Sequence, residues 1–156
     1  MKQVDEGARA LSLEEAYREH RLALLRLAHL VGASRDHAED VVQSAFASAQ
    51  ARWESVDDAL PYLKRAVVNR VQDDQRRWYR RRQRPVDLPE QVVLEPEIDE
   101  TWSVIASLPW VMRAVVVLHY YEDLPLVEVA DVLGRPAATV RSDHRRALER
   151  LRRTLT

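Results

Sequence analysis

The chain contains no cysteine, only 3 glycines and 1 phenylalanine among 156 residues. Without cysteine, disulfides and thiolate metal sites are excluded, which is compatible with a reducing compartment. No apolar run approaches the length of a membrane span, and the opening stretch MKQVDEGARA lacks the apolar core of a signal peptide. We therefore expect a cytoplasmic protein.

The scarcity of glycine also bears on the fold class. Charged residues make up 31% of the chain and apolar residues 46%, and the apolar side chains recur with a helical period along most of the sequence. These features predict an all-α protein of one domain or two small ones, with enough apolar residues to bury a core.

The net charge of −1 hides a strong segregation of charge. Residues 61–84 carry nine basic and two acidic side chains, and residues 135–156 carry seven basic and two acidic ones. Between them, residues 85–100 carry six acidic residues, three prolines and no basic residue. Two basic blocks separated by an acidic segment favour two separate contacts with a polyanion. We therefore expect two cationic helical units held apart by an acidic tether.

The most informative motif lies in residues 125–153. An apolar helical stripe ends at Gly134, a residue type that can take the positive φ found after a helix end. Ala130 is small enough for two helices to cross closely, and Val140 can pin the second helix to the first. Because arginines cover the other faces of the second helix, the motif predicts a DNA-binding helix-turn-helix rather than a helical hairpin with a solvated basic face.

Two capped helices are expected near the start of the chain. Ser12 is a candidate N-cap for a helix over residues 13–31, which Gly32 ends. Ser34 is a second candidate cap, for a helix over residues 35–52. The apolar positions of the first helix include Leu22, Leu25, Ala28 and Leu30.

A third helix begins near Ala59 and carries the first basic block. At the angular step of an α-helix, four apolar residues share one side: Leu63, Val67, Val71 and Trp78. The nearly opposite side holds Asn69, Asp73, Arg76 and Arg80, with Arg77 beside them. A merely solvated face would mix charges of both signs, so the excess of arginine indicates a face that binds an anionic partner.

Catalytic chemistry has little support in the sequence. His20, His29 and His37 are too far apart for any two of them to share a helical turn, and no nucleophile arrangement is present. We expect neither an enzyme nor a bound cofactor or metal.

Three stretches, in this order, resemble the extracytoplasmic-function class of bacterial RNA polymerase sigma factors, and more closely the short actinobacterial kind. AEDVVQSAF at 38–46 resembles the family's polymerase-binding helix, and PYLKRAVVNRVQDDQRR at 61–77 resembles its promoter-melting helix. Residues 108–152 are similar to its second DNA-binding domain. The likeness covers residues 13–153, and the order of the motifs around an acidic linker makes it specific.

This resemblance implies a two-domain, all-α transcription initiation factor that binds core RNA polymerase and promoter DNA. An anti-sigma factor is a further partner that the family implies, while neither a membrane nor a small-molecule substrate is expected. The implied organisation is a flexible tail at 1–12, sigma region two at 13–84, the acidic linker at 85–100 and sigma region four at 101–156.

The resemblance assigns polymerase binding to Asp40 and Gln43. A melted strand offers phosphates and unstacked bases, which cations, amides and carboxylates can bind. A major groove offers phosphates and guanine edges to arginine. The candidate DNA-binding residues are Asn69, Asp73, Arg76, Arg77 and Arg80 on the first basic helix, Arg135 in the turn, and Thr139, Arg141, Ser142, Arg145 and Arg146 on the second.

Four positions leave alternatives open. Trp53 is a candidate stacking surface for a base, although both Trp53 and Trp78 fit core positions better. His144 is expected to be a partly buried core histidine. Asp143 either faces solvent, which we favour, or accepts a hydrogen bond from a cytosine amino group.

A stand-alone helix-turn-helix regulator, with the first unit serving dimerisation, is the alternative function. Such a protein would bind a specific duplex without polymerase. An isolated sigma factor of this kind should bind duplex weakly, so a gel shift with the protein alone distinguishes the two.

Overall fold

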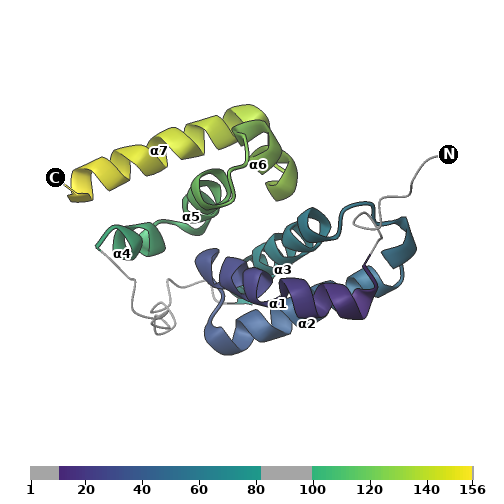
Figure 1. Cartoon of the computed structure of the whole chain (residues 1–156). Helices are drawn as coiled ribbons and strands as arrows, with labels where there is room; N and C mark the ends of the chain where they lie inside the picture. Colours follow the sequence, from purple (N-terminus) through teal and green to yellow (C-terminus); the bar gives the residue numbers. More distant parts are fainter. Residues whose placement is uncertain (1–10, 82–99, 156) are drawn as a thin grey trace.

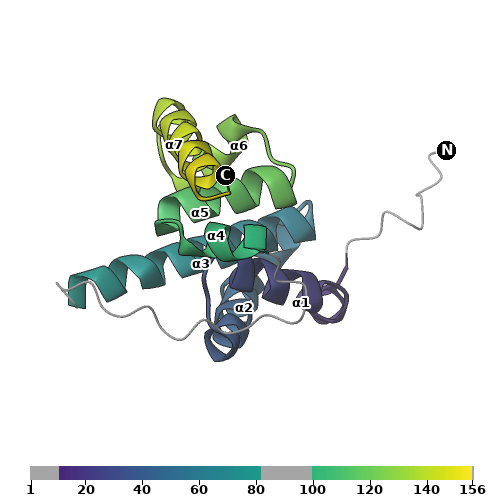
Figure 2. The same cartoon turned by 90° about the vertical axis from the view of Figure 1, so that its left-hand side faces the viewer.

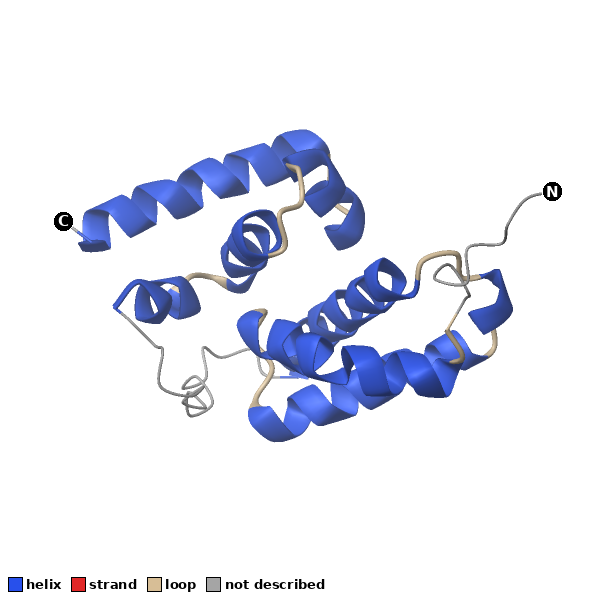
Figure 3. Ribbon diagram, in the orientation of Figure 1, coloured by secondary structure: helices blue, strands red, loops and turns tan. Residues whose placement is uncertain are grey.

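A computed structural model of the chain describes residues 11–81 and 100–155, and the regular elements in these ranges are all helices (Figure 3). Figure 1 shows one group of helices before residues 82–99 and a second group after them. The all-α expectation is confirmed. The expected tail and acidic linker fall almost entirely outside the described residues. Among the helices in the described ranges, none has both the length and the apolar character needed to cross a membrane.

The first group begins with two helices whose N-caps are those predicted. Ser12 Oγ accepts a hydrogen bond from the Glu15 backbone N–H at 3.1 Å, and Ser34 Oγ accepts one from the His37 N–H at 3.3 Å. The elements of this group are α1 (Leu13–Leu30), α2 (Arg35–Gln50), a 3-10 turn (Trp53–Ser55) and α3 (Ala59–Arg81).

Helices α1, α2 and α3 form a three-helix bundle around an apolar core. On α3, the predicted residues Leu63, Val67 and Val71 are buried. On α1, Leu24 and Leu27 are fully buried, whereas Leu22 is 74% exposed. The expected apolar positions of α1 were therefore partly wrong, because only residues three and four apart share a helix face and Leu22 lies off the face that carries Leu24 and Leu27.

In the second group, two helices begin directly after a proline. Pro109 and Pro125 stand immediately before α5 and α6, and α5 ends in a turn with π-helical hydrogen bonds instead of continuing as one helix. The core residues Val115 and Leu118 are buried. The elements of this group are α4 (Glu100–Ser107), α5 (Trp110–Val116), the π-helical turn (Val117–Tyr121), α6 (Leu126–Leu133) and α7 (Ala137–Leu155).

The predicted helix-turn-helix is formed by α6 and α7. Gly134 has φ +63° and ψ +38°, the left-handed conformation expected after a helix. The Arg135 backbone N–H closes the turn by donating to the Ala130 carbonyl at 3.0 Å. Val140 of α7 is fully buried and α7 packs against α6, as the sequence predicted.

The two groups pack against each other, although the sequence suggested units held apart (Figure 2). Their apolar residues form one continuous core cluster. Trp110 Nε1 donates to the Val31 carbonyl at 2.6 Å, and Gln72 Nε2 donates to the Leu133 carbonyl at 3.2 Å. The charge pattern indicates that the linker is polar, but it carries no information on how well the helix ends of one unit complement the other.

Gly32 lies where the turn after α1 meets α5. Its φ is +116°, and a Cβ at this position would lie 3.3 Å from Trp110 Cδ1. We expect Gly32→Ala to lower the free energy of unfolding by about 1–3 kcal/mol, because a side chain is strained at this φ. Urea titration followed by circular dichroism measures the loss.

The matched control is Gly134→Asn. The φ of Gly134 is +63°, and no heavy atom of the described part of the chain lies within 4 Å of a Cβ there. Asparagine tolerates this conformation. Equal losses of stability in the two variants would contradict the strain that we expect at Gly32.

Candidate nucleic-acid interface

The accessible side of α7 is basic. Val140 and Ala147 are buried on one side of this helix, so the opposite side faces solvent. Arg135 in the preceding turn is half-buried. The exposed candidates are Thr139, Arg141, Arg145 and Arg146, and Ser142 is half-exposed among them. Guanidinium and hydroxyl groups on one helix side are the donors that bind phosphates and guanine edges in a major groove.

His144 lies on the core side of α7 and holds this helix to the π-helical turn. Its Nε2 is 2.8 Å from the Tyr120 hydroxyl, and its ring centroid is 5.1 Å from that of His119. Burial, and then the proximity of His119, lower the pKa of His144. The prediction of a partly buried core histidine is confirmed.

Asp143 lies between the core side and the basic side of α7. The residue is half-exposed, but its Oδ2 is buried and has no hydrogen-bond partner among the residues that the structure describes. We favoured a carboxylate that faces solvent. This expectation is wrong for the Oδ2 atom of Asp143, which is buried.

The polar side of α3 carries the other candidates. Asp73, Arg76, Arg77 and Arg80 are exposed, and Asn69 is half-buried. Three of them, Asn69, Asp73 and Arg76, line a groove of about 390 Å³ whose other wall is residues 131–134 at the end of α6. The sequence predicted an open basic face, whereas the structure places part of this face against the helix-turn-helix.

Two further residues of this groove were missed by sequence reasoning. Gln72 is only 5% exposed, because its side chain lies under the end of α6. Arg65 Nη1 lies 2.9 Å from Asp131 Oδ2, and its Nη2 donates to the Asp131 carbonyl at 3.1 Å. The partners are separated by 61 and 66 residues in sequence, so no local pattern would have identified them.

The two candidate tryptophans of the first unit have different environments. Trp53 packs against the core and its Nε1 donates to the Leu11 carbonyl at 2.9 Å. Trp78 is half-exposed near the end of α3, with its ring centroid 5.5 Å from that of Tyr79, which is 63% exposed. The core expectation therefore holds for Trp53 and not for Trp78.

The candidate polymerase contacts Asp40 and Gln43 are exposed on α2. The buried stripe of this helix includes Val41 and Val42, so both candidates lie off it, as the sequence predicted. Neighbouring Glu39 forms an ion pair with Arg21 of α1 at 3.2 Å. The exposed side of α2 thus presents carboxylate and amide groups beside α1.

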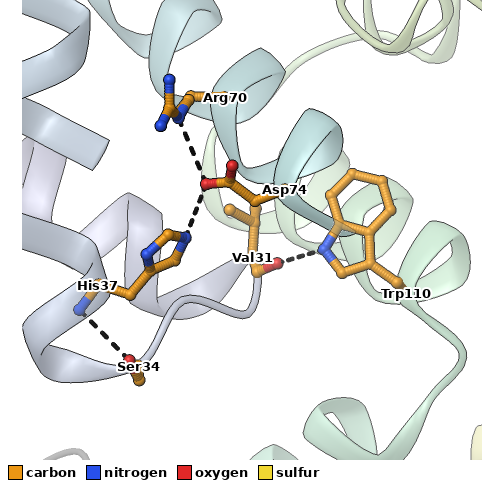
Figure 4. A network of polar contacts seen from close by, with 6 residues as sticks. All are labelled: Val31, Ser34, His37, Arg70, Asp74 and Trp110. Atoms are coloured by element: carbon orange, nitrogen blue, oxygen red, sulfur yellow. Dashed lines mark hydrogen bonds and ion pairs between the residues drawn. The ribbon is translucent and has the colours of Figure 1, made fainter. Parts of the chain in front are cut away.

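Polar contacts join the start of α2 to α3 and the end of α1 to α5 (Figure 4). His37 Nε2 lies 2.7 Å from Asp74 Oδ2, and Arg70 Nε lies 3.4 Å from the same oxygen. Close by, Trp110 Nε1 donates to the Val31 carbonyl. The contact of Asp74 with His37 links α3 to the start of α2, and the Trp110 contact links α5 to the end of α1.

Comparisons with known proteins agree with this arrangement. The family described as Sigma-70, region 4 matches residues 104–153. The chain is 34% identical to the RNA polymerase sigma-E factor of Streptomyces coelicolor, over 93% of this chain and 86% of that protein.

Solved structures show the same fold. The sigma factor RpoE from Bartonella quintana, solved with the anti-sigma factor NepR, superposes with a TM-score of 0.66 at 21% identity, covering 88% of this chain and 94% of that one. CnrH, solved with the cytosolic domain of CnrY, gives a TM-score of 0.60 at 23% identity, covering 92% and 86%.

The helix-turn-helix and its basic accessible side define a DNA-binding protein of the sigma-70 class. The chain belongs to the extracytoplasmic-function (ECF) family of RNA polymerase sigma factors. A sigma factor is a non-enzymatic subunit that directs promoter-specific transcription initiation by RNA polymerase, and this function replaces the alternative of a stand-alone regulator.

Two partly buried histidines, His29 and His144, predict a loss of stability in acid. Burial, the largest cause in each case, lowers the pKa of His29 and of His144 below the ordinary value of 6.5. Between the folded and unfolded pKa values, the unfolded chain binds more protons, so the free energy of unfolding falls as the pH drops below about 6.5. Urea titrations at a series of pH values measure this slope. His144→Gln should make the slope shallower, and an unchanged slope would contradict the assignment.

Proposed function

We propose that this sigma factor contacts its promoter through two helical surfaces, the polar side of α3 at the start-proximal element and the basic side of α7 at the upstream element. The observation that carries the proposal is the one-sided placement of arginine on α7. Arg141, Arg145 and Arg146 are exposed there while Val140 and Ala147 are buried, and this helix lies inside the matched region 104–153.

On α7, the residues near the N-terminus are placed to read bases. A helix that enters the major groove contacts base edges mainly with its first turns. Thr139, Arg141 and Ser142 occupy those turns, and Arg145 and Arg146 follow one turn later. We assign base contacts to the first set and phosphate contacts to Arg135 and Arg146.

On α3, the side chains suit a separated strand better than a duplex. Single-stranded DNA is bound by cations along its phosphates and by aromatic or polar groups at its bases. Arg76, Arg77 and Arg80 supply the cations, and Asn69 and Asp73 supply amide and carboxylate groups. Exposed Tyr79 adds an aromatic surface at the same end of the helix.

We assign polymerase binding to the exposed side of α2, through Asp40 and Gln43. Both side chains are accessible and lie off the core stripe. Their position on a helix separate from α3 and α7 would leave the two DNA-binding surfaces free while the protein is bound to polymerase.

We further propose the domain organisation implied by the sequence: a tail at 1–12, region two at 13–84, a linker at 85–100 and region four at 101–156. The linker boundaries rest on charge and proline content, and the tail boundary rests on the helix cap at Ser12. We place the protein in the cytoplasm, where RNA polymerase works. Because one protein of the same fold was solved with an anti-sigma factor and another with the cytosolic domain of CnrY, we also propose an anti-sigma factor as a regulator.

Reconstituted transcription tests the proposed surfaces. Core polymerase with the wild-type protein is used on a genomic DNA library, and the transcript ends are sequenced to find the promoters. We expect Arg141→Ala and Arg76→Ala each to lower transcription from those promoters about tenfold, since a lost arginine contact to a base or a strand removes about 1–3 kcal/mol.

The matched control is Arg18→Ala, because Arg18 is exposed on α1 and pairs only locally with Glu14. Circular dichroism and thermal unfolding accompany the assay and should be unchanged in all three variants. Unaltered transcription by Arg141→Ala and Arg76→Ala would overturn the proposed surfaces. A large loss of thermal stability would show that these side chains are structural.

A further inference from the structure

A histidine occupies the buried side of α7 between two apolar residues. Val140, His144 and Ala147 lie three or four residues apart on one side of this helix, and Val140 and Ala147 are fully buried. An imidazole brings polar nitrogens and a group that titrates near neutral pH to a position that needs neither for packing. His144 is therefore placed for a polar contact and not for packing alone.

The polar contact is made with the π-helical turn. The Tyr120 hydroxyl lies 2.8 Å from His144 Nε2, and the two ring centroids are 5.7 Å apart with an interplanar angle of 30°. The His119 ring meets the same imidazole, with a centroid distance of 5.1 Å and an interplanar angle of 76°. Three rings from two elements thus form one cluster beside α7.

His119 extends this cluster to the beginning of α6. Its Nδ1 lies 2.7 Å from the Leu124 carbonyl, and because a carbonyl can only accept, this nitrogen carries a proton and donates. The Leu124 N–H in turn donates to the Leu118 carbonyl at 3.1 Å, and α6 begins two residues later. The cluster therefore contacts the entry to α6 through His119 and the middle of α7 through His144.

We propose that Tyr120 and His144 are positioning residues for promoter recognition: the neutral imidazole holds α7 in the setting that reads the upstream element, and protonation of the imidazole releases it. The inference rests on the proposed role of α7 in reading that element. Arg141 and Arg145 are exposed on the basic side of the same helix, three residues before and one residue after His144. Because the side chains of a helix project at fixed angles to one another, a contact that holds His144 also sets the direction of these arginines.

The surroundings of His144 disfavour its protonated form. Burial, and then the proximity of His119, lower the pKa of His144 below the ordinary value of 6.5. A proton is therefore bound more readily when α7 has moved away from the turn than when it is packed there. A protonated imidazole also has no acceptor nitrogen, so the Tyr120 hydroxyl can no longer donate to it. As the pH falls, the packed setting of α7 becomes less populated.

The other charged groups around the cluster have partners elsewhere or face solvent. Glu122, which follows the π-helical turn, pairs with Lys64 of α3, and the Arg113 guanidinium of α5 donates to the carboxyl end of α1. Asp143, the carboxylate next to His144 in the chain, is half-exposed. His119 is therefore the neighbour whose charge bears most directly on His144. The remaining charged side chains of the loop before α6, of α6 and of the middle of α7 are exposed: Asp123, Glu128, Asp131, Arg141, Arg145 and Arg146.

Promoter binding by the reconstituted holoenzyme tests the role of the pair. The probes are two fluorescein-labelled duplexes, a promoter found by transcript mapping and the same duplex with its upstream element scrambled. The measured quantity is the ratio of the two affinities, which reports reading by α7. Effects of pH on polymerase, and the general attraction of protonated histidines for DNA, act on both duplexes and cancel in the ratio.

We expect Tyr120→Phe and His144→Ala each to lower this ratio about threefold to tenfold at about pH 7.5, the range of one hydrogen bond. In the wild type, the ratio should fall by a similar factor between about pH 7.5 and about pH 5.5, as the imidazole is protonated. His144→Gln supplies an amide that can bond to the Tyr120 hydroxyl but does not titrate, so it should keep the wild-type ratio at both pH values.

The matched control is Tyr121→Phe. Tyr121 is 51% exposed, as Tyr120 is, but its ring packs against Trp102 of α4, so its ratio should equal that of the wild type at each pH. Circular dichroism at both pH values checks that every variant is folded.

Three results would overturn the inference: a wild-type ratio that does not fall in acid, an equal fall in His144→Gln, or an unchanged ratio in Tyr120→Phe. Failure of the proposed function is a separate result, because wild-type holoenzyme would then bind both duplexes equally at about pH 7.5. The inference would fall with it, whereas loss of the pH effect alone would leave reading by α7 in place.

Discussion

The carboxyl end of α1 is the point on which the arrangement of the two units depends. A helix leaves its last carbonyls without partners inside the helix, and here Trp110 and Arg113 of α5 supply donors to Val31, Leu30 and His29. Arg113 also places a cation at the negative end of the α1 dipole. Burial lowers its pKa only to about 10, so the charge persists at neutral pH.

This contact determines what lies over α3. Once α5 is fixed on the end of α1, α6 is carried across the polar side of α3, where Arg65 and Gln72 bind it. The basic side of α7 stays exposed at the same time. The two surfaces that we propose for DNA binding therefore differ in the folded chain: the one on α7 is open, and the one on α3 is partly covered.

Local chemistry made much of the fold predictable. Ser12 and Ser34 cap their helices, and Gly134 takes the left-handed conformation that a helix-turn-helix requires. The burial of Val140 and the exposure of Arg141 also follow from helical period alone. Each of these features depends on residues a few positions apart, and such relations are visible in a sequence.

The groove was not predictable in the same way. Gln72 reads as one more polar residue of a basic helix, and its burial depends on a carbonyl 61 residues away. Leu22 was mispredicted for another reason. It is apolar and was expected in the core, but it lies off the buried side of α1 and is 74% exposed. Contacts between helix ends that are far apart in the sequence depend on tertiary packing, which cannot be predicted from composition or from blocks of charge.

The most direct test of the account locks the two units together. Cysteines placed at positions 65 and 131 of the cysteine-free chain lie within reach of a short bis-maleimide whose spacer contains a disulfide, since the native side chains are 2.9 Å apart. The locked protein is compared with the same protein after reductant has cleaved the spacer, in promoter-directed transcription with core polymerase. The account predicts that transcription is lost in the locked form and regained after cleavage. Equal transcription before and after cleavage would contradict it.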